Sequence, residues 1–157
     1  MEDNLVKILF RFYSDILEEE TVETMWASVV DSEKSLYKID NIPFYVFVAC
    51  GDTVFAEYDE LEEMITYRET VEYSGNSTIH VILLNGVSDV LSIRNTLKEL
   101  NCESEGLNEK YFALQVPKAV NYQTIKVHLE DLEIKETLSY SESCLSDKHW
   151  NEVYPNG

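Results

Sequence analysis

The sequence predicts an α+β protein, in which a small antiparallel β-barrel or curled sheet precedes a β-α-β-β-α-β unit. Closely spaced apolar runs separated by turn residues fill the first half of the chain. The second half alternates such runs with two segments of helical periodicity. Hydrophobic residues make up 45% of the 157 residues, so the chain is expected to bury a core rather than remain disordered.

Residues 1–76 are expected to form a strand-rich, acidic subdomain. The runs in this part are rich in β-branched and aromatic residues, which favour strands, and turn residues such as Gly51-Asp52 separate them. The predicted strands are residues 5–13, 24–30, 35–39, 44–50, 53–58 and 64–73. Six mostly antiparallel strands at this spacing are typical of a small barrel or a tightly curled sheet.

Residues 77–146 are expected to form a second subdomain. Strands are predicted at residues 78–84, 102–107, 111–116 and 137–143. Helices are predicted at residues 87–101, where Ser88 can act as N-cap, and at residues 121–135. This order of elements is the split βαβ, or ferredoxin-like, arrangement. Residues 147–157 are expected to be a loosely held tail, because chain ends usually are.

Acidic residues exceed basic residues by a wide margin, and the excess is uneven. The chain has 30 Asp and Glu against 12 Lys and Arg, a net charge of -18. Residues 1–76 hold 18 acidic and 5 basic residues, net -13, whereas residues 77–157 hold 12 and 7, net -5. A net charge of about 2–8 in magnitude keeps a small domain in solution. The surplus costs stability through self-repulsion, and its simplest use is to steer the protein toward a cationic partner.

The same composition excludes several classes of protein. No segment approaches the roughly 18 apolar residues of a membrane span, and the acidic start of the chain is unlike a signal peptide. Direct binding to nucleic acid or to an anionic membrane requires Lys and Arg, which are scarce here. We therefore expect a cytoplasmic protein that contacts neither nucleic acid nor membrane.

Motifs for catalysis, metal binding or cofactor binding are missing from the sequence. The three cysteines lack zinc-site spacing, and the three histidines lack a nucleophile or ligand companion at a meaningful distance. No glycine-rich nucleotide loop and no calcium loop occurs. The turn at residues 74–77 is predicted to be a β-turn or a hinge between the two halves. We expect a non-enzymatic protein with no metal and no cofactor.

Four short motifs occur in a fixed order along the chain. They are Glu23-Thr24-Met25-Trp26-Ala27, Tyr37-Lys38-Ile39-Asp40-Asn41-Ile42-Pro43-Phe44, Gly51-Asp52 and Tyr73-Ser74-Gly75-Asn76-Ser77. In these motifs the chain resembles an uncharacterised bacterial group, domain-of-unknown-function family 4265, over roughly residues 5–145. The resemblance implies a bacterial origin but no established activity and no catalytic residues. Position 76 is often His in that family, so Asn76 removes a ring that could have served as a general base.

The leading hypothesis is an immunity protein, which would inhibit a basic, nuclease-like toxin through an acidic surface. Complementary charge accelerates the encounter of two proteins, and an acidic plug can occupy a groove that is built for phosphate. Acids of two connectors are the expected contacts, with three tyrosines as aromatic anchors. These residues are Asp15, Glu18, Glu19, Glu20, Glu23, Asp59, Glu60, Glu62 and Glu63, together with Tyr13, Tyr58 and Tyr67.

Other functions remain open at this stage. Acidic runs are often no more than solvated connectors. The same surface could also act as a nucleic-acid mimic that blocks a DNA-binding enzyme. The second subdomain could be a small-molecule sensor, since ferredoxin-like units often bind ligands at sheet edges or dimer interfaces. An enzyme ranks last, and neither the identity of the partner nor the oligomeric state follows from the sequence.

Overall fold

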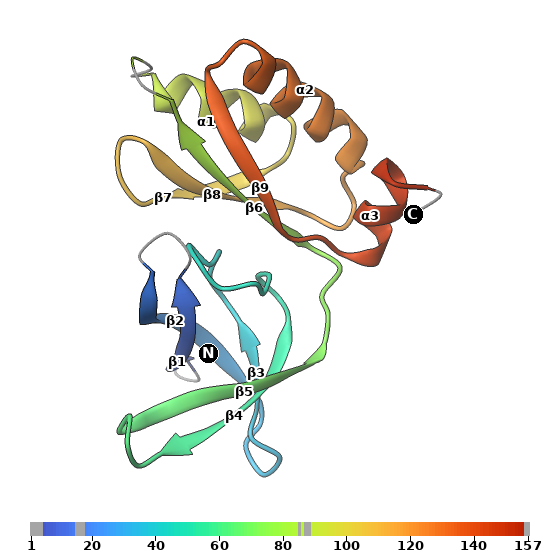
Figure 1. Cartoon of the computed structure of the whole chain (residues 1–157). Coiled ribbons are helices and arrows are strands. Elements are labelled where there is room, and N and C mark those ends of the chain that lie inside the picture. The colour runs from blue at the N-terminus through green and yellow to red at the C-terminus, as the bar shows by residue number, and fades with distance from the viewer. Residues whose placement is uncertain (1–4, 15–17, 85, 87–88, 156–157) are drawn as a thin grey trace. The chain divides into compact units, whose positions relative to one another are not determined.

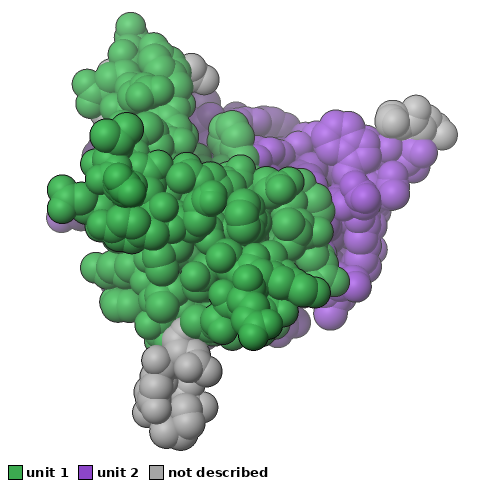
Figure 2. Space-filling view, turned by 90° about the horizontal axis from the view of Figure 1, so that it is seen from below, with its two compact units in different colours: residues 1–74 green, residues 75–157 purple. Residues whose placement is uncertain are grey.

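The structure is a computed structural model that describes residues 5–14, 18–84, 86 and 89–155. These residues form nine strands and three helices (Figure 1), and nearly all strand pairs are antiparallel. The prediction of an α+β protein with mostly antiparallel sheets is confirmed. The chain divides into two compact units, residues 1–74 and 75–157, which are coloured green and purple in Figure 2. The first unit ends two residues before the boundary expected from the sequence.

The first unit consists of five strands whose sheet closes on itself. The strands are β1 (Leu5–Ser14), β2 (Glu19–Asp31), β3 (Leu36–Ile39), β4 (Thr53–Asp59) and β5 (Met64–Glu72). Each strand pairs antiparallel with the next one along the chain. A parallel pairing of β1 with β5, at Leu9 and Thr66, closes the ring of strands. This arrangement brings the ends of the β1–β2 and β4–β5 hairpins within reach of each other.

Alternate residues of these strands fill the core of the first unit. Ile8 and Phe10 of β1 point inward, as do Met25 and Ala27 of β2, and all four are buried. This alternation is expected of a sheet with one covered face. Leu9, between Ile8 and Phe10, is also buried, whereas Arg11, the next residue of β1, is exposed.

The strand predicted at residues 44–50 is wrong. This segment is an irregular loop between β3 and β4, and the backbone N–H groups of Phe44, Tyr45 and Val46 donate to the Glu23 carboxylate instead of to a neighbouring strand. The apolar composition that predicted a strand has another cause, because Val46 and Val48 insert into the core.

The second unit is a four-stranded antiparallel sheet with helices on one face. Its elements are β6 (Ser77–Leu83), α1 (Val90–Glu99), β7 (Glu103–Gly106), β8 (Tyr111–Val116), α2 (Tyr122–Ile134), β9 (Leu138–Cys144) and α3 (Asp147–Val153). The strand order is β7-β8-β6-β9, so β7 and β9 are the edges. Helices α1 and α2 lie on the same side of the sheet (Figure 1) and bury Leu97, Ile125 and Leu129 against β6 and β8.

Both long helices begin at a side-chain cap. Asp89 caps α1 by accepting the backbone N–H of Ser92, whereas the predicted cap Ser88 lies outside the described residues. Asn121 caps α2 through the N–H of Gln123. Such oxygens satisfy N–H groups that have no partner within the helix. In the part of the chain described, no helix combines the length and the apolar character that a membrane crossing needs.

The loosely held tail expected after residue 146 is wrong for residues 147–153. These residues form α3, and the His149 side chain is completely buried. Its Nδ1 pairs with the Ser77 hydroxyl at 2.6 Å, and its Nε2 lies 2.9 Å from the Val120 carbonyl oxygen. The carbonyl can only accept, so Nε2 donates. Burial lowers the pKa of His149 and favours the neutral imidazole, in which Nδ1 accepts from Ser77. This buried pairing holds α3 to β6.

Candidate partner-binding surface

The β1–β2 and β4–β5 hairpins share one backbone hydrogen bond and one unusual φ angle. In the first, the backbone N–H of Glu18 donates to the carbonyl of Ser14 at 2.7 Å; in the second, the N–H of Glu63 donates to that of Asp59 at 2.7 Å. Glu18 and Glu63 have φ angles of 56° and 57°, in the left-handed region that favours glycine. Both hairpins therefore carry a glutamate at a backbone position that a glycine would occupy at lower cost.

Most of the acids predicted as contacts lie at the surface of these two hairpins. Tyr13 and Tyr58 lie beside them with 59% and 61% of their surface exposed. The predicted contact Asp15 lies outside the described residues. The exposed acids are Glu18, Glu19, Glu20, Glu60 and Glu63. Large exposed aromatic side chains next to charged groups are typical of protein interfaces.

Arg11 connects the two hairpins. Its Nε and Nη2 donate to the Glu62 carboxylate at 2.6 and 2.8 Å, a bidentate pair, and its Nη1 lies 3.7 Å from Glu20 Oε1. The hydrogen bonds from Arg11 hold the pKa of Glu62 below its ordinary value. The two acidic segments thus meet in one surface, which we call the acidic surface: Glu18, Glu19, Glu20, Glu60, Glu62 and Glu63, with Tyr13 and Tyr58.

Asp59 has a role inside its own hairpin. One carboxylate oxygen accepts the backbone N–H groups of Leu61 and Glu62, at 2.8 and 3.0 Å. The other accepts from the Arg68 guanidinium at 3.0 Å. This arginine and the two N–H donors hold the pKa of Asp59 below its ordinary value. The side chain therefore shapes the turn that presents Glu60 and Glu63.

Glu23 and Tyr67 are not placed as exposed contacts. The half-buried Glu23 carboxylate accepts the N–H groups of three successive loop residues, at 2.6, 3.1 and 3.2 Å. Burial raises the pKa of Glu23, while these three donors oppose the rise. The Tyr67 ring stacks on Phe10 at 4.7 Å, and its hydroxyl pairs with Thr70 Oγ1 at 2.9 Å. Both residues stabilise the fold under the surface that the sequence assigned them to.

An apolar groove that the sequence did not predict lies next to the acidic surface. It has a volume of about 220 Å³ and runs between β1, Tyr67 of β5 and the β3–β4 loop. Phe47 forms an open wall with 73% of its surface exposed, and Tyr45 stacks on Phe12 at 6.0 Å. Arg11 lines the groove and pairs with acids of both hairpins, so groove and acidic surface are contiguous. We call it the aromatic groove; its lining residues are Phe10, Arg11, Phe12, Tyr45, Val46, Phe47, Val48 and Tyr67.

Side chains fix the loop that carries Phe47 along its length. Asn41 accepts the backbone N–H of Trp26 at 2.6 Å near the start of the loop. Buried Asp52 accepts the N–H groups of Ala49 and Ser74, at 3.0 and 2.8 Å, near its end. The three bonds to Glu23 hold the middle. The acceptors come from the motifs singled out in the sequence, so those motifs hold this loop in place.

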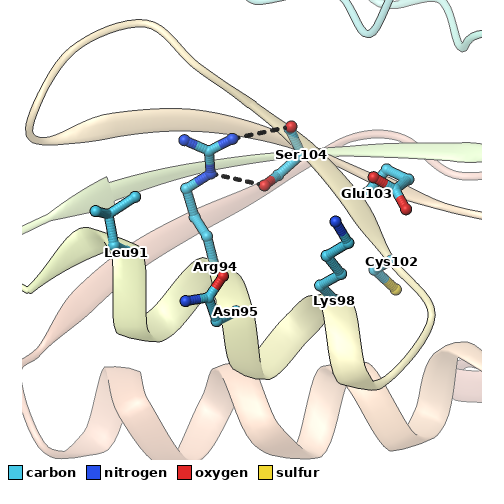
Figure 3. A pocket seen from close by; sticks show the side chains of 7 residues that line it. All are labelled: Leu91, Arg94, Asn95, Lys98, Cys102, Glu103 and Ser104. Carbon is cyan, nitrogen blue, oxygen red and sulfur yellow. Dashed lines mark hydrogen bonds between the residues drawn. The ribbon is translucent and has the colours of Figure 1, made fainter.

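The second unit has a separate, more polar cavity of about 190 Å³ between α1 and the edge strand β7 (Figure 3). Arg94 of α1 lies across it and donates from Nε to the Ser104 hydroxyl at 2.8 Å and from Nη2 to the Ser104 carbonyl at 3.0 Å. Lys98 and Glu103 also line the cavity. Burial raises the pKa of Cys102 to about 12, so its thiolate, the reactive form, is scarce at neutral pH.

Glu142 of β9 is the centre of a polar network in the second unit. The Glu142 carboxylate accepts from Lys126 at 2.7 Å, from Tyr122 at 2.5 Å and from Tyr154 at 2.6 Å. These donors outweigh burial and hold the pKa of Glu142 below its ordinary value. A carboxylate whose oxygens are all engaged ties α2 and α3 to β9 but is not available as a base. Among the described residues, no group of three His, Cys, Asp or Glu is placed to hold a metal ion.

Comparison with known proteins places the chain in a family without a known activity. No curated protein matches it. A crystal structure of a hypothetical protein from Neisseria gonorrhoeae is similar, with a TM-score of 0.76 and 23% identity over 89% of this chain and 94% of that chain. At this identity the likeness shows the fold alone. The family model described as a domain of unknown function, DUF4265, matches residues 23–140, about three quarters of the chain. The resemblance found in the sequence motifs is thereby confirmed, and the chain belongs to the DUF4265 family.

Proposed function

We propose that this protein is a non-enzymatic, cytoplasmic immunity protein that inhibits a basic, nuclease-like toxin through its acidic surface. The observation that carries the proposal is the bridge made by Arg11, which draws the acids of two hairpins into one exposed cluster. A concentrated negative patch accelerates the approach of a cationic partner and opposes a wrong one. Exposed Tyr13 and Tyr58 supply apolar area beside the charges.

The proposal extends to the fold class of each unit. We assign the closed five-stranded sheet to the small β-barrels. We assign the second unit to the ferredoxin-like group, because its strand order and its two helices on one face match the split βαβ arrangement. Neither assignment implies an activity, since many unrelated functions occur on each fold.

Charge reversal tests the acidic surface. The variant Glu19→Lys/Glu20→Lys/Glu60→Lys leaves the two strained turn residues in place, and the control Glu130→Lys/Asp131→Lys/Glu133→Lys makes the same charge change on exposed positions of α2. The partner to use is the purified toxin that this proposal expects the neighbouring gene to encode. Surface plasmon resonance should show association at least about tenfold slower for the first variant and only a small change for the control.

Salt and partner range sharpen this test. Association of the wild-type protein should slow as ionic strength rises, because the screening length falls to about 8 Å at 0.15 M salt. An association rate that is unaffected by both salt and charge reversal would contradict the acidic surface as the contact. A nucleic-acid mimic would inhibit several unrelated DNA-binding proteins equally well, whereas an immunity protein should favour one toxin.

A second candidate function rests on the cavity between α1 and β7. Arg94 and Lys98 place two of the seven basic residues of the second half around one hollow, at a sheet edge. As the alternative function, we propose that this cavity binds a small anionic ligand, which would make the protein a sensor. A thermal-shift titration with inorganic phosphate and with acetate tests it, and stabilisation that disappears in Lys98→Met would support it. Equal melting temperatures with and without these anions would remove this candidate.

A further inference from the structure

We propose that the aromatic groove receives an apolar side chain, preferably an aromatic one, from a Lys- or Arg-rich segment of the partner. This inference rests on the proposed function, because it names the part of a basic partner that anchors at the acidic surface. The argument uses the size of the groove, the charges on its rim and the fixed position of its outer wall.

The size and the lining of the groove suit an aromatic ring. An apolar cavity of about 150 Å³ is large enough to hold benzene in a protein interior, and the groove measures about 220 Å³. The rings of Phe10 and Tyr67 line one part of it, and Phe12 and Tyr45 line another. Offset or tilted packing against such rings adds to the gain from apolar burial.

The charges at the rim select what flanks the inserted side chain. Arg11 is the basic residue among the lining residues, and its guanidinium is paired with Glu62 and lies close to Glu20. One cation shared by two carboxylates leaves a net negative charge beside the groove. A segment with Lys or Arg on both sides of its apolar residue matches that rim, and an acidic segment is repelled. An apolar centre with a charged border is the usual anatomy of a protein interface.

The exposed wall of the groove is held in place before any partner arrives. Phe47 follows directly after the three residues whose N–H groups are bound by Glu23, and buried Val46 and Val48 flank it. The loop backbone therefore cannot collapse into the groove without breaking these bonds. A pre-organised wall reduces the entropy lost on binding, which favours a specific anchor over a chance apolar patch.

Two peptides test the inference directly. Acetyl-Lys-Lys-Phe-Lys-Lys-amide carries the proposed anchor, and the same peptide with Ala in place of Phe carries the charges alone. Titration into the ¹⁵N-labelled protein, followed by NMR chemical shifts, should show the Phe peptide binding about tenfold more tightly. Its largest shifts should fall on the amides of Tyr45 and Phe47.

Variants separate the groove from the charges. Phe47→Ala should abolish the preference for the Phe peptide, while Leu61→Ala, which removes a 94% exposed side chain outside the groove, should leave the preference intact. Equal affinity of the wild-type protein for both peptides, or no binding of either, would overturn the inference.

The same titrations distinguish the groove from the acidic surface. If both peptides bind equally and the charge-reversal variant weakens both, the groove inference fails and the acidic surface stands. If the preference for Phe persists but charge reversal changes neither affinity, the basic flanks are refuted and the proposed function fails with them.

Discussion

The glutamates at the hairpin turns make a direct test of whether this protein has given up stability for its acidic surface. Glu63 has a φ of 57° and its N–H closes the β4–β5 turn. A non-glycine residue in the left-handed region costs the folded state about 1–2 kcal/mol. Glycine avoids this cost, but its larger conformational entropy in the unfolded chain lowers stability by about 0.5–1 kcal/mol. Glu63→Gly should therefore raise the free energy of unfolding of the first unit by about 0.5–1 kcal/mol.

Glu60→Gly is the matched control for this change. Glu60 lies in the same turn, is exposed and has no positive φ, so its replacement removes the same charge without relieving any strain. It should lower the free energy of unfolding by about 0.5–1 kcal/mol. The two variants are thus expected to differ by about 1–2 kcal/mol, or several degrees in melting temperature for a unit of this size.

Tryptophan fluorescence reports the first unit separately. The chain has two tryptophans, Trp26 in β2 and Trp150 in α3, so a Trp150→Phe background leaves a single probe in the first unit. Urea titration then measures the free energy of unfolding of that unit. If Glu63→Gly is no more stable than Glu60→Gly, the positive φ costs nothing and the reasoning is refuted. If the more stable variant also binds the partner more weakly, stability and binding are traded against each other at this residue.

Two further predictions concern buried polar groups. Glu23→Ala should lower the free energy of unfolding of the first unit by at least about 1–3 kcal/mol, because three loop N–H groups lose their acceptor. Trp26 fluorescence in urea measures this free energy, and the control Glu69→Ala, at an exposed position, should change it little. Burial lowers the pKa of His149 below its ordinary value of 6.5, so the unfolded chain binds a proton first and the second unit should lose stability as pH falls below about 6.5. Urea midpoints from Trp150 in a Trp26→Phe background should fall over this range, and His149→Gln should flatten the slope; an unchanged slope would assign the pH dependence to other groups.

The sequence predicts elements well where the local pattern decides them. The strand at residues 111–116 has the predicted bounds, and the helix at residues 121–135 differs by one residue at each end. The strand at residues 44–50 is wrong because its N–H groups are satisfied by Glu23, about twenty residues earlier, which no local pattern reveals. The prediction of a loosely held tail is wrong for a similar reason, because the side chain of His149 hydrogen-bonds to Ser77, 72 positions earlier in the chain.

The sequence predicts which acidic residues form the candidate site but not how they are arranged in space. Acidic connectors are visible as runs of Asp and Glu, and most of these acids are exposed. The contact of Arg11 with Glu62 joins residues 51 positions apart, so the meeting of the two hairpins follows only from the closed sheet. The sequence does not reveal the aromatic groove, because it predicts a strand where the outer wall of the groove, including Phe47, is an irregular loop.

The ion pairs of the basic residues indicate that the negative charge of the first half is concentrated at particular positions rather than spread evenly over the surface. The first half of the chain has only five basic residues against 18 acids, and two of the five each lie between two carboxylates. These groups are Arg11 with Glu20 and Glu62, and Arg68 with Glu57 and Asp59. One cation between two anions reduces their repulsion but leaves a net negative charge, so the carboxylates stay close together without being neutralised. A chain that needed only solubility could spread its acids apart, whereas Arg11 holds Glu20 and Glu62 together beside a groove that has room for an apolar anchor.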